Sequence, residues 1–230
     1  IIRGARQVGK TTLVNHFALE FDTYLYLNLD KERDLRLFDE DDTITLVDKI
    51  YIHCKKQKKA GSTLLFIDEI QNSPEAVKML RYFKEDIPEL YVIAAGSLLE
   101  TLIDTQISFP VGRVEYMSLR PCSFTEFLNG IGEVFDAEVV KSLKADAIHE
   151  RIMNHFLNYI LVGGMPEAIM KYAEKRDILS VNKIYNTFMN AYSDDVQKYA
   201  HNKTMSAVIR HILKEGWSYA AEPISFNNFA

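Results

Sequence analysis

The first 120 residues of the chain alternate between short apolar runs and segments with helical periodicity. The runs at 23–29, 64–67 and 91–97 are rich in aromatic or aliphatic residues and have the length of strands, and a further strand is predicted at 114–119. Between the runs, apolar residues recur at every third or fourth position, which is typical of helices with one buried face. The pattern predicts an α/β domain in which helices connect the strands of a parallel sheet.

Two predicted helices in this region have well-defined inward faces. One follows the acidic residues 39–42 and ends at the lysine-rich segment 55–59, and the other begins at Pro74. The residues predicted to point inward are Ile44, Val47, Tyr51 and Cys54 on the first helix, and Val77, Leu80 and Phe83 on the second.

The lysine-rich segment 55–59 has two explanations. Acidic residues at the start of a helix and basic residues at its end are favoured by the helix dipole. A lysine run is also a nucleic-acid-binding pattern. The chain has a net charge of −5, so we favour the first explanation.

From Pro121 onward the pattern becomes almost entirely helical. Ser123 and Glu126 have the spacing of a capping box, and 163–167 predicts a tight turn between two helices. We predict three parts: a core at 1–128, a helical lid subdomain at 129–200, and the start of another domain at 201–230. Both ends of the chain lie inside predicted elements, and we therefore expect it to be a fragment of a longer protein.

The most specific motif stands at the beginning of the chain. Residues 4–11 read GARQVGKT and match the pattern G-x-x-x-x-G-K-T of phosphate-binding loops. Glycines let successive backbone N–H groups surround an anion, and the helix that follows adds its positive end. We expect Lys10 to contact the β- and γ-phosphates and Thr11 to ligate Mg²⁺. The residues predicted to bind the nucleotide are Gly4, Ala5, Arg6, Gln7, Val8, Gly9, Lys10, Thr11 and Thr12.

A second motif is needed, because a glycine-rich turn before a helix has the same composition. The apolar run at 64–67 ends in Asp68 and Glu69. Ligands of open α/β sheets bind at the carboxyl ends of the strands, where these carboxylates fall. Asp68 suits a position from which it holds Mg²⁺ through water or through Thr11. Glu69 suits the residue that polarises the attacking water. Two carboxylates standing alone would be read as the start of a solvated loop.

Two further residues are weaker candidates for catalysis. Ser97, at the end of the predicted strand 91–97, could sense the γ-phosphate, although Gly-Ser is also ordinary turn chemistry. Arg113 precedes another strand and could stabilise transition-state charge in its own subunit or in a neighbour. Most arginines at strand starts are structural.

Composition narrows the class of protein. No apolar stretch approaches the length of a membrane span, and Cys54 and Cys122 lack the spacing of a metal site. We therefore expect a cytoplasmic protein with reduced thiols and no membrane partner. His149 and Glu150 begin a zinc-protease-like pattern, but Met153 stands where the second histidine belongs. No guanine-specific N-K-x-D pattern is present, which favours adenine as the base.

The ordered set of motifs resembles one family. GARQVGKTT, FIDEIQ, AAGS, GR, RPCSFTEF and VGGMPE follow one another as in bacterial and archaeal AAA-type ATPases with a C-terminal domain of unknown function, akin to the archaeal ATPase branch of the P-loop proteins. The resemblance covers the chain from about Ile1 to Asp195. Ala5 and Cys122 differ from the residues usual in that family.

The resemblance implies a five-strand parallel sheet, a helical lid and, after about residue 200, the start of a winged-helix-like domain. It also implies nucleotide contacts by Gly9, Lys10, Thr11 and Thr12, roles in Mg²⁺ and water binding for Asp68 and Glu69, and a sensor role for Ser97. Arg113 matches the Gly-Arg of the family.

Three functions stay open from the sequence. The first is Mg²⁺-dependent ATP hydrolysis. The second is a nucleotide-gated switch, in which ATP or ADP occupancy repositions the C-terminal region to engage protein or DNA with little turnover. The third, a small-molecule kinase, is disfavoured by the pair Asp68 and Glu69. Oligomeric state and physiological partner are left undecided.

Overall fold

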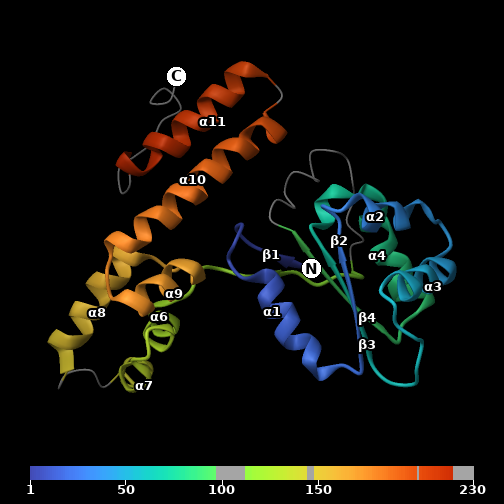
Figure 1. Ribbon diagram of the computed structural model, residues 1–230, viewed down its shortest axis with the longest axis horizontal. Helices are drawn as coiled ribbons and strands as arrows, with labels where there is room; N and C mark the ends of the chain where they lie inside the picture. Colours follow the sequence, from blue (N-terminus) through green and yellow to red (C-terminus); the bar gives the residue numbers. More distant parts are fainter. Residues whose placement is uncertain (97–111, 144–147, 201, 220–230) are drawn as a thin grey trace. The chain divides into compact units, whose positions relative to one another are not determined.

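The computed structural model describes residues 1–96, 112–143, 148–200 and 202–219. Its contacts divide the chain into two compact units, Ile1–Pro121 and Cys122–Ala230. Ser97 lies outside the described residues. Figure 1 shows the helices and strands of both units.

The first unit is built on a sheet of five parallel strands, which confirms the predicted α/β architecture. The spatial order is β2-β3-β4-β1-β5, so β4 lies between the strand before the phosphate loop and the strand that carries Asp68. The strands are β1 (Ile2–Arg3), β2 (Thr23–Asn28), β3 (Thr63–Asp68), β4 (Leu90–Gly96) and β5 (Met117–Ser118).

β5 is shorter than the predicted strand 114–119. It is an edge strand that pairs only with β1, so its ladder extends no further than the two residues of that strand. Met117 and Ser118 stand opposite Ile2 and Arg3.

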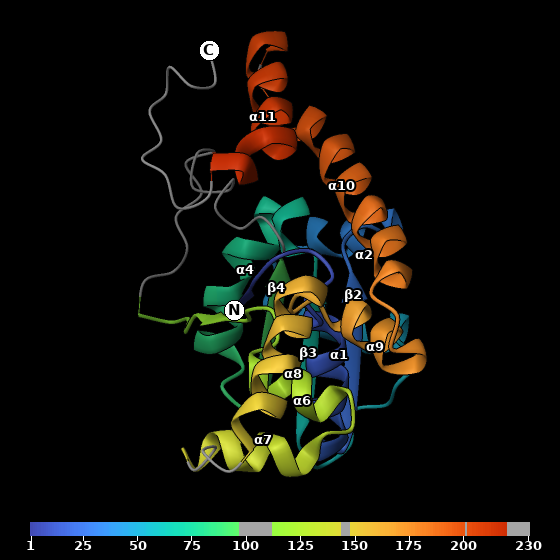
Figure 2. The ribbon, with the colours of Figure 1, turned by 90° about the vertical axis from the view of Figure 1, so that its left-hand side faces the viewer.

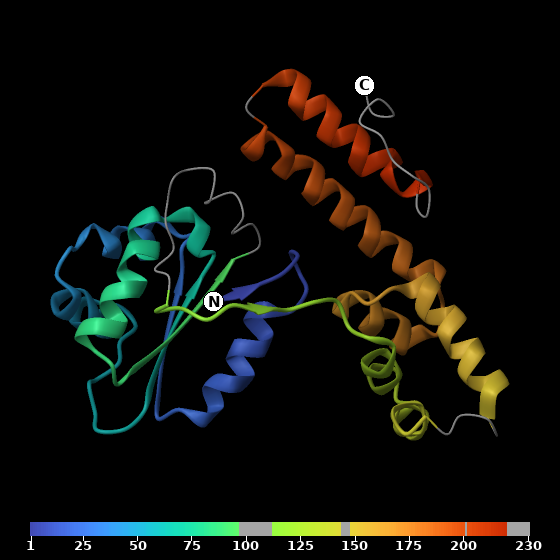
Figure 3. The ribbon, with the colours of Figure 1, turned by 180° about the vertical axis from the view of Figure 1, so that it is seen from behind.

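Helices cover both faces of the sheet, because successive side chains of a strand point to opposite sides. Leu64 and Phe66 of β3 pack with α1 (Lys10–Phe17), whereas Leu65 and Ile67 pack with α3 (Thr43–His53) and α4 (Pro74–Asp86). Figures 1 and 3 show α1 on one side of the strands and α3 with α4 on the other. Since β3 is buried along its whole length, its apolar run shows no polar alternation.

The predicted inward face of α4 is confirmed, whereas that of α3 is only partly correct. Val77, Leu80 and Phe83 of α4 are buried as expected. On α3 the buried stripe is Leu46, Val47, Ile50 and Tyr51, whereas Ile44 is 58% exposed. The helix begins at Thr43, with the Asp42 side chain accepting from the N–H of Thr45; Thr43 is buried, whereas the next residue, Ile44, faces solvent.

Short helical turns complete the first unit. η3 directly follows β3 and therefore borders Asp68 and Glu69. These turns are η1 (Ala18–Glu20), α2 (Glu32–Leu35), η2 (Arg36–Asp39) and η3 (Ile70–Asn72).

The second unit is helical throughout its described part (Figure 2). The predicted capping box is present at the start of its first helix: Ser123 Oγ accepts from the N–H of Glu126, and the Glu126 carboxylate accepts from the N–H of Ser123. Its helices are α6 (Phe124–Gly130), α7 (Val134–Lys141), α8 (His149–Val162), α9 (Pro166–Lys175), α10 (Leu179–Tyr199), α11 (Lys203–Glu215) and η5 (Gly216–Tyr219).

The core of the second unit explains where the boundary between the units falls. Phe127 and Leu128 of α6 are fully buried against apolar residues of α9 and α10, among them Ile169 and Val181. α6 therefore belongs with the helices that follow it, and the contact boundary lies at Pro121, seven residues before the predicted end of the core.

The predicted tight turn between two helices is present after Val162. Gly163 has φ +75°, and a Cβ there would lie 2.4 Å from the hydroxyl oxygen of Tyr185, which itself donates to the carbonyl of Val162. α9 then begins at Pro166, whose ring suits a first helical position. No helix among the described residues combines the length and the apolar composition that a membrane crossing requires.

Candidate nucleotide-binding site

The loop between β1 and α1 has the backbone geometry of a tight anion cradle. Gly4 has φ +153°, and a Cβ at this position would lie 2.3 Å from the backbone oxygen of Leu119. Gly9 has φ +99° and caps α1, and Gln7 between them is also left-handed with φ +61°. The two glycines are thus required by the backbone path, as the motif predicts.

Lys10 lies inside the loop that precedes it. Its side chain is buried, and its Nζ donates to the carbonyl oxygens of Gly4 and Ala5, each at 2.9 Å. The pKa of Lys10 is lowered from its ordinary value, chiefly because the ammonium group is buried. The negative charges of Glu69 and Asp68 act in the opposite direction and offset part of this effect. The ammonium group and both carboxylates therefore act on one another in the same site.

A hydrogen bond joins the loop to the carboxylate motif. Thr11 Oγ1 donates to Asp68 Oδ2 at 2.7 Å, across 57 positions of sequence. Asp68 is buried at the carboxyl end of β3, and Tyr26 of β2 donates to the same oxygen at 3.4 Å. The hydroxyl and the carboxylate are oxygen donors of the kind that Mg²⁺ prefers, so this pair fits the predicted metal position.

Glu69 occupies the turn directly after β3. Its φ of +55° is left-handed, which is uncommon for a residue with a side chain, and its N–H donates to Asp68 Oδ1 at 3.1 Å. Gln71 Nε2 donates to Glu69 Oε2. Gln71 ends the FIDEIQ motif, but it was not singled out from the sequence as a site residue, because no chemical role was assigned to it.

The sheet order explains why these residues meet. β4 stands between β1 and β3, with Gly96 opposite Arg3 and Ala95 opposite Asp68. The carboxyl ends of the three strands are therefore level, and the phosphate loop follows directly from one of them. Ser97 is the next residue after β4 but lies outside the described residues, so its sensor role stays a prediction.

The structure does not bring Arg113 to this edge of the sheet. Arg113 Nε donates to Glu85 Oε1 at 2.7 Å, and Arg81 binds the same oxygen at 3.0 Å. Arg113 lines a cavity together with Leu90, the first residue of β4. Five residues of strand, about 16 Å, separate Leu90 from Ala95 beside Asp68.

The other residues predicted to bind the nucleotide differ in how far their side chains are exposed to solvent. Val8 is buried in the loop, Arg6 is half-buried near Lys10, and Ala5, Gln7 and Thr12 are exposed.

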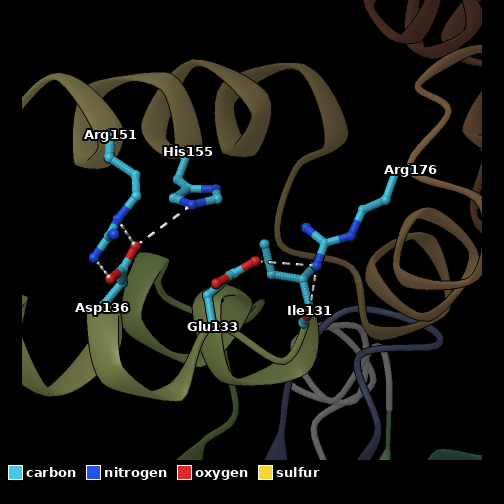
Figure 4. A network of polar contacts seen from close by, with 6 residues as sticks. All are labelled: Ile131, Glu133, Asp136, Arg151, His155 and Arg176. Atoms are coloured by element: carbon cyan, nitrogen blue, oxygen red, sulfur yellow. Dashed lines mark hydrogen bonds and ion pairs between the residues drawn. The ribbon is translucent and has the colours of Figure 1, made fainter.

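A second polar cluster lies in the helical unit (Figure 4). Ligand atoms of Glu133, Asp136 and His155 lie within 4.8 Å of one another, an arrangement that the sequence analysis did not predict. Arg151 donates to both oxygens of buried Asp136, and Arg176 donates to Glu133 and to the carbonyl of Ile131. Two guanidinium groups thus balance two carboxylates, and we assign the cluster to tying α7 to α8.

Comparisons with known proteins agree with the motifs. Residues 1–128 match the AAA domain family, and residues 153–229 match a domain of unknown function. A search of curated proteins finds no match.

Two matching solved structures are of the ORC2 protein of Aeropyrum pernix, one with ADPNP-ADP complexes and one in the ADP form. They are 13% and 14% identical, with TM-scores of 0.37 and 0.35, and the matches span 99% of this chain and 76% of each of those chains. TM-scores this low carry no conclusion of their own.

The family match extends over more than half of the chain and includes the phosphate loop, Asp68 and Glu69. These residues meet at one edge of a parallel sheet, as a nucleotide site requires. The chain belongs to the AAA domain family of nucleotide-binding P-loop proteins.

Proposed function

We propose that the protein binds ATP with Mg²⁺ and hydrolyses it to ADP and phosphate. The observation that carries this proposal is the hydrogen bond between Thr11 Oγ1 and Asp68 Oδ2, at 2.7 Å. It joins two motifs that are far apart in sequence into the donor pair that a metal-bound triphosphate needs.

The phosphate groups would be held by the loop and by Lys10. The Nζ of Lys10 now bonds two loop carbonyls, and a triphosphate entering the loop offers stronger, charged acceptors to the same ammonium. The N-terminus of α1 adds its partial positive charge at the same point. ATP is favoured over GTP because the sequence lacks the guanine-specific pattern.

Thr11 and Asp68 would hold Mg²⁺, Thr11 as a direct ligand and Asp68 through water or through Thr11. When bound, the ion would neutralise negative charge on the triphosphate. The fold keeps the carboxylate of Asp68 buried and hydrogen-bonded to the hydroxyl of Thr11, so both groups are already in place to hold the ion.

Glu69 would orient the water that attacks the γ-phosphorus. The water oxygen forms a bond to phosphorus while the bond to the β–γ bridging oxygen breaks, and the electron pair leaves with ADP. The water proton passes to the Glu69 carboxylate and then to the released phosphate. We propose Ser97, the residue that follows β4 in the sequence, as a γ-phosphate sensor. A role for Arg113 would fall on the nucleotide of a neighbouring subunit, after its pair with Glu85 is broken.

Phosphate release with Mg²⁺-ATP tests the proposal through Glu69→Gln. We expect the wild type to turn over and the variant to bind ATP while losing at least about a hundredfold in kcat. Glu75→Gln is the matched control, because Glu75 is an exposed glutamate on the adjacent helix α4. Equal turnover in wild type and Glu69→Gln would contradict the assigned role of Glu69.

A nucleotide-gated switch is the second candidate. The helical unit forms nearly half of the chain and contains a matched domain of its own, which favours a partner-binding role beside the nucleotide site. If wild type and Glu69→Gln both bind ATP and neither turns over, with or without added DNA, the switch replaces hydrolysis as the function.

A further inference from the structure

Gln71 makes a contact that the roles assigned above do not use. It lies in η3, two residues beyond Glu69, and its Nε2 donates to Glu69 Oε2. The identity of this donor atom is set by charge: the opposite orientation of the amide would place its oxygen against a carboxylate oxygen. One of the two oxygens of Glu69 is thereby held, and the other is left to act on water.

The other end of the same amide is unsatisfied. Gln71 Oε1 is buried and has no hydrogen-bond partner among the described residues. A buried acceptor without a donor is unfavourable and marks a place where a donor is expected to bind. Because Oε1 and Nε2 share one carbon atom, that place lies directly beside the Glu69 carboxylate.

A purely structural role explains the contact less well. The hydrogen bond links residues only two positions apart and therefore ties no distant segments together. The neighbouring residue does tie the turn to another element, because Asn72 Nδ2 donates to Asp30 Oδ1 at 2.8 Å and to the carbonyl of Leu29 at 3.5 Å. Asn72 thus anchors the turn to the segment after β2. The side chain of Gln71 is not needed for that anchoring.

We propose that Gln71 positions Glu69 and the attacking water together. Its Nε2 fixes one oxygen of the Glu69 carboxylate, and its Oε1 accepts one O–H of the water whose other O–H points to the free oxygen of Glu69. A water held by two acceptors keeps a lone pair directed away from both, toward the γ-phosphorus. This inference rests on the proposed hydrolysis of ATP.

The kinetic test uses the full chain with Gln71→Met, which keeps the length of the side chain and removes both polar atoms. Losing a hydrogen bond to a charged group predicts a decrease in kcat of about ten- to a hundredfold. The Kd for ATP and the Tm are expected to stay near the wild-type values. Gln71→Glu, which retains acceptors but places a second carboxylate beside Glu69, is expected to lose at least as much.

Asn72→Ala is the matched control for loosening of the turn. We expect it to change the Tm more than kcat, because the Asn72 side chain donates to Leu29 and Asp30, whereas its bond to the carbonyl of Glu69 comes from the backbone and is kept in the variant. The inference is overturned if Gln71→Met turns over like the wild type, or if Asn72→Ala lowers kcat as much as Gln71→Met does.

A readout without turnover separates this inference from the proposed function. The chain has five glutamines, so ¹⁵N-glutamine labelling gives a short list of side-chain amide signals, and Gln71→Met identifies the one from Gln71. We expect that signal to move toward the position of an exposed glutamine in Glu69→Ala. If it does not move, the contact is absent and the inference fails, whatever the ATPase assay shows.

Failure of the proposed function and failure of the role of Gln71 give different experimental results. A wild type that binds ATP without hydrolysing it ends both the proposed function and the catalytic role of Gln71, even if the amide signal responds to Glu69→Ala. A wild type that hydrolyses ATP while Gln71→Met is unaffected ends only the role of Gln71.

Discussion

Gly4 shows how closely the phosphate loop is fitted to the rest of the first unit. The backbone of Leu119, which follows β5, passes so near that a Cβ on Gly4 would meet its carbonyl oxygen at 2.3 Å. The neighbour is backbone and not a flexible side chain, so it cannot move aside without disturbing the pairing of β5 with β1. The first glycine of the motif is therefore needed for packing, apart from the role in nucleotide binding that we propose for the loop.

We expect Gly4→Ala to destabilise the protein by about 3 kcal/mol or more and to abolish ATP binding, because strain at a positive φ and a backbone clash act together. Gly112→Ala is the control: its φ is +78°, but no neighbouring atom of the described residues lies within 4 Å of the added Cβ. That variant has the strain alone and should cost about 1–2 kcal/mol. Urea unfolding of both variants compares the two costs, and equal losses would contradict the clash.

At the scale of elements, α6 illustrates a helix whose start is specified locally. Ser123 and Glu126 cap it reciprocally, and its apolar residues Phe127 and Leu128 follow within the next turn. Backbone and hydroxyl hydrogen bonds from Ser123 lower the pKa of Glu126. The cap is thus stronger when Glu126 is ionised.

Ser123→Ala is expected to lower the free energy of unfolding by about 1 kcal/mol at neutral pH. Because the folded pKa of Glu126 lies below its ordinary value of 4.5, its contribution is present above that value and is lost as pH falls through the folded pKa. The difference between wild type and variant should therefore shrink below about pH 4.5. Urea unfolding across this range measures it, and a difference that stays constant down to pH 3 would exclude a contribution from the hydrogen bond between the Ser123 hydroxyl and ionised Glu126.

α3 illustrates the limit of periodicity at the same scale. The apolar residues around position 47 fit a helix with its face centred on either Ile44 or Leu46, and the pattern alone selects neither. The packing of Leu46 and Ile50 against the sheet and α4 decides the rotation, and Ile44 is left in solvent.

For the whole molecule, the open question is how the nucleotide acts on the helical unit. The phosphate loop, Asp68 and Glu69 all belong to the unit Ile1–Pro121, whereas the predicted lid at 129–200 belongs to the other. The proposed lid function requires nucleotide occupancy to change the second unit as well as the first.

Hydrogen exchange with and without Mg²⁺-ATP tests this requirement on the full chain. If 129–200 acts as a lid, amides of α8 and α9 should gain protection together with those of the loop and α1. Lys10→Ala should remove both effects, because it removes a ligand of the phosphates. Protection confined to the first unit would show that the helical unit is not a lid.

What the sequence determined by itself is what depends on near neighbours in the chain. The loop of 4–11, the apolar strands, the capping box at Ser123 and the turn at Gly163 are set by backbone conformation and local hydrogen bonds, which residue type specifies directly. The approach of Asp68 to the loop was also predicted, because Asp68 stands at the carboxyl end of a strand.

Only the tertiary structure decided the features that depend on pairing over long distances. Strand order places β4 between the two motifs, and packing turns Ile44 outward. The pair with Glu85 holds Arg113 away from the site, and the contact of Gln71 with Glu69 depends on a left-handed turn that no residue pattern announces. Strand order, the exposure of Ile44 and the contacts of Arg113 and Gln71 depend on which surfaces pack together in the folded protein. The spacing of residues along the sequence carries little information about this packing.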